Sequence, residues 1–512
     1  WIVLQELDLS YVTVSRLWRL NGRCLGSLTG LTVDEAVASH GKPSVDKWLF
    51  GSEPPPAYEP DHQFHPKDDR RYKAWQEPRP PWRLRQVPIP EAESFECVRE
   101  RCEPVWKELL LPDISKGKSV LVVAHADTIR AIMIDVCNVN REECTVLEPD
   151  PCAPMHFTFE RRDGAVVPVA ASTTGTLAPA PEVAAEEAAA EAAGARPWWR
   201  GASGTASEEG TASEAKAVPA SAASLPAEPF AAELLPVGTP SKRQEVVIIR
   251  HGKTFNNQLG IFTGWDDAPL APEGREEAAK AGRLLRKYGY EFDVVYTSWL
   301  TRAIQTAWLV LSEMDMMWLP EHKTWRLNER MYGSLTGVSK KATKEQFGDV
   351  QFKAWRRGYD TRPPRTTTFS QYYPGNDARY VNNIDDVRIS VTQTIMRSYD
   401  LGRLSIHRKL PRTESLKDCM ERTIPYWTST IEPEAIDVGK SVLVSTSENA
   451  IRGLLMHLCG IPKERISEIE IPTGLPLVYD LRERRLRLLE GVPSDYNFGK
   501  GVDMLFTPHD AR

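Results

Sequence analysis

Three short apolar runs in the C-terminal half of the chain end at polar turns, which is the pattern of buried parallel strands. They are EVVIIR (245–250), FDVVYTS (292–298) and SVLVST (441–446). Segments with helical spacing of apolar residues stand between and after these runs, at 273–288, 302–311 and 450–459. The alternation predicts an α/β fold with a mostly parallel sheet that is covered by helices on both faces. In such sheets, ligands bind outside the carboxyl ends of the strands.

The same sequence pattern occurs twice in the chain. Residues 1–30 align without a gap to residues 308–337, and 15 of the 30 positions are identical. Three further matches between the N-terminal and the C-terminal copy are Glu93-Ser94 with Glu414-Ser415, Arg101 with Arg422, and GKSVLV at 117–122 with GKSVLV at 439–444. In both copies GKSVLV predicts a turn that enters a strand. The N-terminal copy has no counterpart of residues 244–307, so we expect one complete and one partial copy of the fold.

Residues 171–242 differ in composition from the sequence on either side of them. They are rich in Ala, Glu, Ser, Gly and Pro and contain few aliphatic residues, so burial would not offset the entropy of ordering them. We predict a flexible linker there, between a partial domain at 1–170 and a catalytic domain at 243–512. Residues 375–413 have helical spacing and are an insertion relative to compact members of the family that residues 244–480 resemble; we place them as a lid or edge element beside the predicted site.

Composition and charge exclude several classes of protein. The 512 residues are 41% hydrophobic and carry a net charge of -6, which gives no sign of a nucleic-acid-binding surface. The chain contains no apolar run of about 18 residues, so we expect no membrane span. The eight cysteines show no C-x-x-C spacing, which favours free thiols in a reducing compartment, either cytoplasm or plastid. The sequence leaves open whether the chain forms a homo-oligomer.

Candidate chemistry gathers around Arg250-His251-Gly252, at the carboxyl end of the first predicted strand. A histidine at a strand end is more often a packing residue than a catalyst, but its arginine neighbours change that balance. Arg302 follows the second strand, and Arg356-Arg357 stands in KAWRRGYD; guanidinium groups suit phosphate and carboxylate oxygens. A polar loop that contains Asn257, Thr263 and Gly264 adds backbone N–H groups that suit a phosphate.

Six ordered blocks in residues 244–480 resemble the cofactor-dependent phosphoglycerate mutases of the histidine phosphatase superfamily. The blocks are RHGKTFNNQLGIFTGWDDAPLAPEG, YTSWLTRAIQTAW, WRLNERMYGSLTG, WRRGYD, ESLKDCMERTIPYW and IPTGLPLVYD. R-H-G alone is a weak signal, but six blocks in family order are highly specific. The WRLNER and WRR segments favour the mutase branch over general histidine phosphatases.

The resemblance implies a role for each matched residue. His251 is implied as the residue that becomes phosphorylated, with Arg250 and Arg302 neutralising the transferring phosphoryl group and Glu329 as general acid/base. The positions implied to bind substrate are Asn257, Thr263, Gly264, Tyr332, Lys340, Arg356, Arg357 and Asn449. The implied ligands are small phosphorylated three-carbon acids, with 2,3-bisphosphoglycerate as the priming phosphate donor and no metal.

One block departs from the family pattern. The second catalytic histidine of the family is expected where STSENAIRG (445–453) has Ser447, and Glu448 replaces a glycine. Loss of one preorganised donor costs about 3–4 kcal/mol of transition-state stabilisation, although Ser447 retains one hydroxyl donor. A carboxylate at Glu448 repels phosphate unless it points away. We therefore expect a slower mutase or local compensation.

The N-terminal copy shows the complementary pattern. It keeps a family-like histidine, His125, where the other copy has Ser447. It has lost the acid/base and the substrate-binding residues, whose positions are taken by Gly22, Leu25, Val33 and Leu49-Phe50. We interpret His125 as a relic in a structural domain; the alternative is that it serves the C-terminal site in trans.

Three functions remain open on the sequence alone. The leading one is an isomerase that interconverts 3- and 2-phosphoglycerate through a phosphohistidine. The second is a phosphatase of the same superfamily, in which water reaches the phosphohistidine first. The third is a non-catalytic pseudoenzyme or scaffold, which Ser447 favours and which the intact set of His251, Arg302 and Glu329 disfavours.

Overall fold

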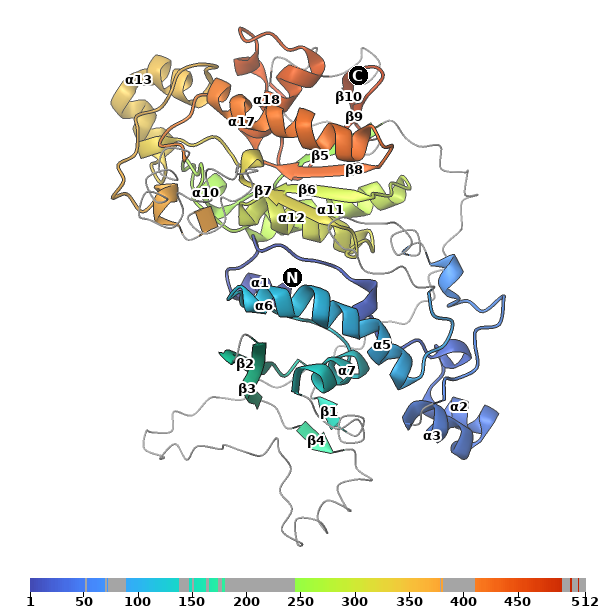
Figure 1. Ribbon diagram of the computed structural model, residues 1–512. Coiled ribbons are helices and arrows are strands. Elements are labelled where there is room, and N and C mark those ends of the chain that lie inside the picture. Colours follow the sequence, from blue (N-terminus) through green and yellow to red (C-terminus); the bar gives the residue numbers. More distant parts are fainter. Residues whose placement is uncertain are drawn as a thin grey trace, which may run out of the picture. The chain divides into compact units, whose positions relative to one another are not determined.

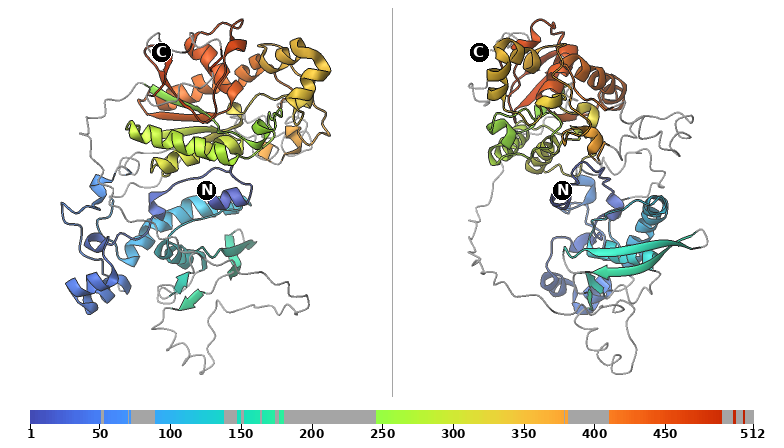
Figure 2. Two further views of the ribbon diagram at one scale, coloured as in Figure 1. Left: turned by 180° about the vertical axis from the view of Figure 1, so that it is seen from behind. Right: turned by 90° about the vertical axis from the view of Figure 1, so that its left-hand side faces the viewer.

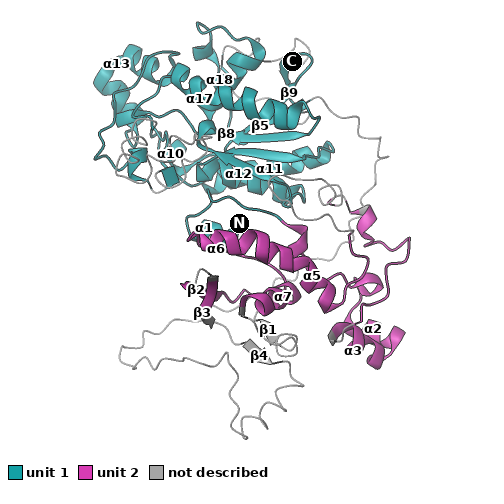
Figure 3. Ribbon diagram, in the orientation of Figure 1, with its two compact units in different colours: residues 1–16, 230–512 teal, residues 17–229 magenta. Residues whose placement is uncertain are grey.

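The computed structural model divides into two compact units, and each is described by itself (Figure 3). Unit 1 contains Trp1–Arg16 and Phe230–Arg512, and unit 2 contains Leu17–Pro229. The structure describes residues 1–50, 53–69, 71, 89–137, 147–149, 152–162, 165–173, 177–179, 245–377, 379–380, 410–489, 498–499 and 505. Among these residues, no helix combines the length and the apolar character needed to cross a bilayer.

Unit 1 is an α/β structure built on one sheet. Its strands are β5 (Glu245–Arg250), β6 (Val294–Ser298), β7 (Glu321–Thr324), β8 (Val442–Thr446), β9 (Pro476–Asp480) and β10 (Arg485–Arg487). Its α-helices are α1 (Ile2–Glu6), α10 (Phe255–Gln258), α11 (Pro272–Lys287), α12 (Thr301–Glu313), α13 (Lys340–Arg357), α17 (Leu416–Tyr426) and α18 (Glu448–Cys459). Its shorter turns are η6 (Trp325–Leu327), η7 (Gly333–Leu335), η8 (Pro374–Asn376) and η11 (Ile466–Glu468), and the π-helix η10 (Trp427–Ile436) continues α17.

The sheet has the order β10-β9-β5-β8-β6-β7. The neighbouring pairs β5–β8, β8–β6 and β6–β7 are parallel. The pairs β5–β9 and β9–β10 are antiparallel. The three predicted strands and the helices predicted at 273–288, 302–311 and 450–459 are present, with bounds that differ by a few residues. The prediction of an α/β fold with a mostly parallel sheet is therefore confirmed.

Helices cover both faces of this sheet (Figure 1). Alternate strand residues point to opposite sides, so the apolar residues of each strand give both faces an apolar surface on which helices pack. Val246 and Ile248 of β5 belong to a core cluster with apolar side chains of α17 and α18. Val247 and Ile249 belong to a second cluster with side chains of α11 and α12. The predicted placement of helices on both faces is thus confirmed, and the carboxyl ends of the parallel strands are left for the site.

Trp1–Arg16 belongs to unit 1, although the repeat assigns these residues to the N-terminal copy. The ammonium of Lys323, a residue of β7, donates to the carbonyl oxygens of Ser10 (2.7 Å) and Val12 (2.9 Å). The rings of Trp1 and Trp308 lie 6.0 Å apart, and these two residues are equivalent in the repeat. The start of one copy therefore packs against its own counterpart in the other.

Unit 2 is mostly helical in the residues that the structure describes. Its helices and turns are η1 (Trp18–Leu20), η2 (Gly26–Leu28), α2 (Val33–His40), α3 (Lys42–Phe50), η3 (Pro66–Asp68), α5 (Phe95–Val105), η4 (Trp106–Leu110), α6 (Leu111–Ser115) and α7 (Ala126–Cys137). Its strands are β1 (Leu147–Pro149), β2 (Met155–Arg162), β3 (Ala165–Thr173) and β4 (Leu177–Pro179), paired as β1 with β4 and β2 with β3 (Figure 2). Its core lies where α5 packs on α7, around Val98, Cys102 and Ala131.

The predicted strand in GKSVLV forms in only one copy. Residues 442–446 are β8, whereas 118–125 are described without strand pairing. Leu121 is 58% and Val123 76% exposed, while Leu443 and Val444 of β8 are buried. The physical reason is the lack of strand partners: β8 lies between β5 and β6, whereas no described strand pairs with residues 118–125. The strand prediction is wrong there.

Two other predicted segments fall largely outside the described residues. β3 and β4 reach into the range 171–242, so paired strands extend beyond the predicted start of the linker, and residues 180–242 are not described. Of the insertion 375–413, residues 381–409 lie outside the description, and with them the predicted lid. Tyr380 and Leu410 beside this gap are buried in a cluster with Trp265 and Trp299.

Candidate active site

The site lies where β5 and β8 end side by side. His251 follows β5, and Ser447 follows β8. The backbone N–H of His251 donates to the carbonyl oxygen of Thr446 at 2.9 Å, which continues the parallel pairing by one residue. The residue predicted as nucleophile and the position of the departed second histidine are therefore neighbours across the sheet, as carboxyl ends of adjacent parallel strands must be.

Gly252 fixes the turn that leaves β5. A Cβ atom at this position would lie 2.1 Å from the carbonyl oxygen of Gly274 in α11, so the R-H-G motif needs glycine for a close backbone approach. The N–H of Gly252 also donates to the Thr306 hydroxyl at 3.0 Å, and that hydroxyl donates to the Arg302 carbonyl at 2.7 Å. Hydrogen bonds therefore fix the backbone N–H of His251 to β8 and that of Gly252 to α12.

The His251 ring is buried and arranged to act as a nucleophile. Its Nδ1 lies 2.8 Å from the carbonyl oxygen of Gly252. Because a carbonyl oxygen only accepts, this contact places the proton on Nδ1 and the lone pair on Nε2. Burial, followed by the charges of Arg302 and Arg250, holds the pKa of the imidazole well below its usual range. The ring is therefore neutral at physiological pH.

Two arginines flank this ring. Arg250 Nη1 donates to the Ile471 carbonyl at 2.5 Å, and Nη2 lies 3.2 Å from the Glu448 carboxylate. Arg302 is fully buried in α12; it donates to the carbonyl oxygens of Asp266 (2.9 Å) and Gly264 (2.7 Å), and burial lowers its pKa. Both guanidinium groups are therefore fixed by the backbone before any ligand binds.

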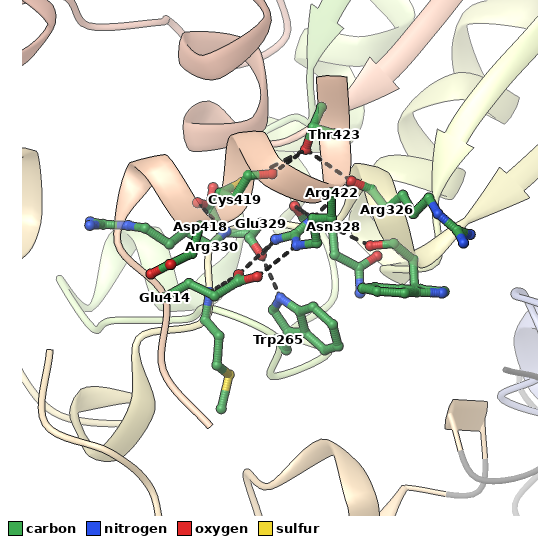
Figure 4. Close-up of polar contacts among 12 residues, drawn as sticks. Trp265, Arg326, Asn328, Glu329, Arg330, Glu414, Asp418, Cys419, Arg422 and Thr423 are labelled. Carbon is green, nitrogen blue, oxygen red and sulfur yellow. Dashed lines mark hydrogen bonds and ion pairs between the residues drawn. The ribbon is translucent and has the colours of Figure 1, made fainter. Parts of the chain in front are cut away.

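Glu329 is carried by a loop that a buried ion pair holds in place. The Arg422 guanidinium contacts the Glu414 carboxylate at 2.8 Å and donates to the carbonyl oxygens of Arg326 (2.8 Å), Asn328 (2.9 Å) and Glu329 (2.9 Å) (Figure 4). The Glu414 carboxylate in turn accepts from the N–H of Met331 at 2.9 Å. Because both charges are buried and paired, this network positions the loop.

The Glu329 carboxylate lies at the start of α18. It accepts from the Asn449 side-chain amide at 2.6 Å, from the Asn449 backbone N–H at 3.3 Å, and from the Arg330 N–H at 2.8 Å. The same amide donates to the Tyr332 hydroxyl at 3.0 Å. Glu329, Asn449 and Tyr332, three of the predicted site residues, are therefore in one hydrogen-bonded group.

The cationic residues predicted to bind substrate lie at the two ends of α13. Lys340 begins the helix, and burial, with help from Arg356, lowers the pKa of its ammonium to about 8. Arg357 ends it and makes ion pairs with Glu448 and, at 2.8 Å, with Glu470. The Arg356 guanidinium lies over the Phe352 ring at 5.9 Å from its centre. These ends contribute positive charge to the site.

The substituted block adds a hydroxyl and a paired carboxylate. Ser447 is 0% exposed, and among the described residues its Oγ has no hydrogen-bond partner. Glu448 contacts Arg250 and Arg357 rather than facing solvent. Burial alone would raise the pKa of the Glu448 carboxyl, but Arg250, Arg357 and Arg452 outweigh it and hold the pKa well below its usual range. Glu448 is therefore an anion inside the site.

The predicted polar loop contributes mainly backbone structure. The Asn257 side-chain oxygen accepts from the N–H and hydroxyl of Thr254, which caps α10. Gly264 has φ +56 and offers its carbonyl to Arg302, while the Thr263 carbonyl accepts from the Asp266 N–H at 3.0 Å. Direct contact of Asn257, Thr263 or Gly264 with substrate stays a prediction.

His125 lies inside unit 2, beside the residue that replaced the acid/base. A Cβ atom on Gly22 would lie 3.2 Å from Cγ of the His125 ring. The ring therefore covers the position from which a glutamate side chain would extend. This neighbour accounts for His125 within its own unit and supports the interpretation as a relic.

Three charged residues of the site were not assigned a role from the sequence. Arg330 is fully buried, donates to the carbonyls of Trp355 and Arg356 (both 2.8 Å), and lies over the Tyr332 ring. Arg452 donates to the Asn449 side-chain oxygen at 2.9 Å, and Glu470 pairs with Arg357. Arg330 directly follows Glu329, which was a usable signal, whereas nothing in the local sequence marks Glu470.

Comparisons with known proteins match a segment of each copy to one family model. Residues 59–171 and 246–387 match the model of the histidine phosphatase superfamily (branch 1). A mycobacterial glucosyl-3-phosphoglycerate phosphatase is similar at 18% identity over 46% of this chain and 92% of its own, with a TM-score of 0.33. The alpha-ribazole phosphatase from Shigella flexneri is similar at 22% identity over 49% and 100% of the two chains, with a TM-score of 0.32. The first of the two matched segments contains His125, and the second contains His251.

Proposed function

We propose that unit 1 transfers a phosphoryl group through a phosphohistidine at His251, and that its reaction is the interconversion of 3- and 2-phosphoglycerate. One observation carries the proposal: a buried, neutral imidazole with its lone pair on Nε2 lies among fixed guanidinium groups. This combination favours attack at phosphorus, because the nucleophile needs no deprotonation and the cations balance the phosphoryl charge.

In the first half-reaction, Nε2 of His251 forms a bond to phosphorus while the bridging P–O bond of the donor breaks. Arg250 and Arg302 contact the equatorial oxygens, and Ser447 supplies a hydroxyl donor. Glu329 gives a proton to the leaving oxygen. In this scheme 2,3-bisphosphoglycerate is the donor that primes the histidine, and the cationic ends of α13 suit its second phosphate and its carboxylate.

In the second half-reaction, Glu329 removes the proton of the acceptor hydroxyl, and that oxygen takes the phosphoryl group from Nε2. Asn449 orients the Glu329 carboxylate through two hydrogen bonds, so the base is fixed before the acceptor binds. Tyr332, Lys340 and Arg356 are proposed to hold the carboxylate of the acceptor. No net proton is consumed, as an isomerisation requires.

Hydrolysis is the second candidate, and one contact favours it. Arg357, one of the cations at the ends of α13 that the mutase scheme assigns to the second acidic group of the ligand, is already paired with Glu448 and Glu470. A weakly held acceptor leaves water as the competing nucleophile at the phosphohistidine. The chain would then act as a phosphatase on small phosphorylated acids.

One experiment separates these functions. The full chain and its His251→Ala variant are incubated with 2,3-bisphosphoglycerate labelled on phosphate, with and without 3-phosphoglycerate. We expect an acid-labile phosphoprotein in the parent chain only, and transfer of label to phosphoglycerate. Label that appears only as inorganic phosphate favours hydrolysis. The absence of both phosphoprotein and turnover would reject both reactions and leave the non-catalytic interpretation.

A further inference from the structure

The Glu448 carboxylate joins two cations of the site that come from different elements. Its Oε2 lies 3.2 Å from Arg250 Nη2, at the end of β5, and its Oε1 pairs with Arg357 Nη1, at the end of α13. Arg250 precedes the proposed nucleophile, and Arg357 stands at a predicted substrate-binding position. An acidic group of the chain itself therefore occupies the space between them.

This carboxylate remains charged and fixed. Arg250 and Arg357 hold it ionised, and it is the first residue of α18, where the helix dipole also favours a negative charge. In the N-terminal copy the equivalent residue is Ala126, and Leu49-Phe50 replace the arginine pair. The glutamate thus occurs in the copy that has the arginines, and is absent from the copy that lacks them.

The same site contains buried donors that have no protein acceptor. Among the described residues, Arg250 Nε, Arg302 Nε, Arg330 Nη1 and Ser447 Oγ are buried without a hydrogen-bond partner. Buried donors without acceptors are unfavourable, so several in one site indicate a place for an external anion. Glu448 satisfies Arg250 Nη2 and Arg357 but leaves these donors free. These donors are therefore available to pair with one anionic group, while Glu448 already pairs with the cations Arg250 and Arg357.

We propose that Glu448 is a charge-selecting residue. Its carboxylate holds, in the ligand-free site, the position between Arg250 and Arg357 that the second acidic group of a ligand would take. A ligand with one phosphate binds beside His251 with Glu448 in place. A ligand with a further carboxylate or phosphate binds strongly only when it displaces Glu448. The inference rests on the phosphohistidine function proposed above and defines its preference among acidic ligands.

Glu448→Gln tests this directly, because the amide keeps the size of the side chain and removes its charge. Binding of inorganic phosphate and of 3-phosphoglycerate to the full chain is measured by titration calorimetry. Removal of one charge beside two guanidinium groups should tighten 3-phosphoglycerate binding about tenfold and phosphate binding less than about threefold. Glu448→Asp, which keeps the charge, should retain the selectivity of the parent chain.

Glu470→Gln is the matched control, since Glu470 pairs with the same Arg357 but not with Arg250. We expect it to tighten 3-phosphoglycerate binding by less than about threefold and so by less than Glu448→Gln does, because the Glu470 side chain is 42% exposed and solvent screens its charge. If Glu448→Gln weakens both ligands or leaves both unchanged in a chain with normal circular dichroism, Glu448 is a structural ion-pair partner and the inference is wrong.

The labelling experiment at His251 distinguishes the two proposals. A chain that forms no phosphohistidine but shows the tenfold change in binding refutes the proposed function and retains charge selection. A chain that forms phosphohistidine and shows no change in selectivity refutes charge selection alone.

Discussion

The two copies differ in their catalytic residues, but the same buried hydrogen-bond network holds the loop at the WRLN segment of each copy. In unit 1, Arg422 pairs with Glu414 at 2.8 Å; in unit 2, Arg101 pairs with Glu93 at 2.6 Å. Arg101 also donates to the carbonyls of Asn21 (2.8 Å) and Gly22 (3.0 Å), the equivalents of Asn328 and Glu329. The ion pair and its carbonyl acceptors are therefore present in both copies.

The agreement extends to details of the backbone. The N–H of Ser27 donates to the Pro56 carbonyl at 2.9 Å, and the N–H of Ser334 donates to the Pro364 carbonyl at the same distance. The preceding glycines, Gly26 and Gly333, have φ of 53 and 61, where a side chain would be strained. Unit 2 therefore has the same loop geometry as unit 1, although it lacks the glutamate that the loop of unit 1 carries. This teaches that the residues that build the loop are separable from the residue that performs the chemistry.

The largest effect should come from substitution of the acid/base position, which is Glu329 in unit 1 and Gly22 in unit 2. Glu329→Gln should lower kcat for phosphoglycerate interconversion by about 10²–10⁴-fold, because an amide cannot accept the substrate proton. KM should change little, since the amide oxygen can still accept from Asn449. Steady-state kinetics over a range of 3-phosphoglycerate concentrations measures both constants.

The counterpart in unit 2 is Gly22→Glu. It should give no phosphoryl transfer when His251 is replaced by Ala, since unit 2 has no R-H-G block and the His125 ring lies 3.2 Å from the new Cβ. Turnover by the Gly22→Glu/His251→Ala chain would show that unit 2 retains chemistry, contrary to this comparison.

The next largest effect concerns the buried ion pair that both copies contain. Its removal should lower the stability of either unit, but lower kcat only in unit 1. Arg422→Met and Arg101→Met each leave a buried carboxylate unpaired, which should destabilise the unit concerned by about 3–5 kcal/mol. Unfolding in urea, followed with a probe for each unit, measures both losses. Arg422→Met should also lower kcat, because the loop that carries Glu329 loses its anchor. Equal effects of the two variants on kcat would contradict the conclusion that only the loop of unit 1 carries a catalytic residue.

The second-histidine position offers a smaller contrast. Ser447→Ala removes a buried donor and should lower kcat about tenfold to hundredfold, the value of one hydrogen bond to a charged group. Ser447→His should raise turnover by restoring a stronger donor. His125→Ala should leave kcat unchanged, since His125 is accounted for within unit 2. A loss of activity in His125→Ala with unchanged stability would instead support action in trans.

Periodicity and motif order were sufficient to predict the sheet, the helices on both of its faces, and the clustering of Glu329, Tyr332 and Asn449. They failed at 118–125, because a strand needs partners that the local sequence does not reveal. They also failed to predict the contacts of Glu448: a local pattern gives the charge, but not the two arginines from distant segments that bind it. Long-range pairing is the information that periodicity lacks.

The smallest effect concerns Lys340, which unit 2 replaces with Val33. Because burial lowers the pKa of Lys340 to about 8, its charge is present below pH 8 and lost as the pH rises through that value. The low pKa of His251 has the opposite consequence: the imidazole stays neutral until the pH falls well below 6.5, so the acidic limb lies there. We therefore expect kcat/KM to fall a fewfold above about pH 8. Lys340→Arg, whose charge persists, should remove this alkaline limb, whereas Val33→Arg in unit 2 should leave the pH profile unchanged. An alkaline limb that persists in Lys340→Arg would assign it to another group and remove Lys340 from the set that binds substrate.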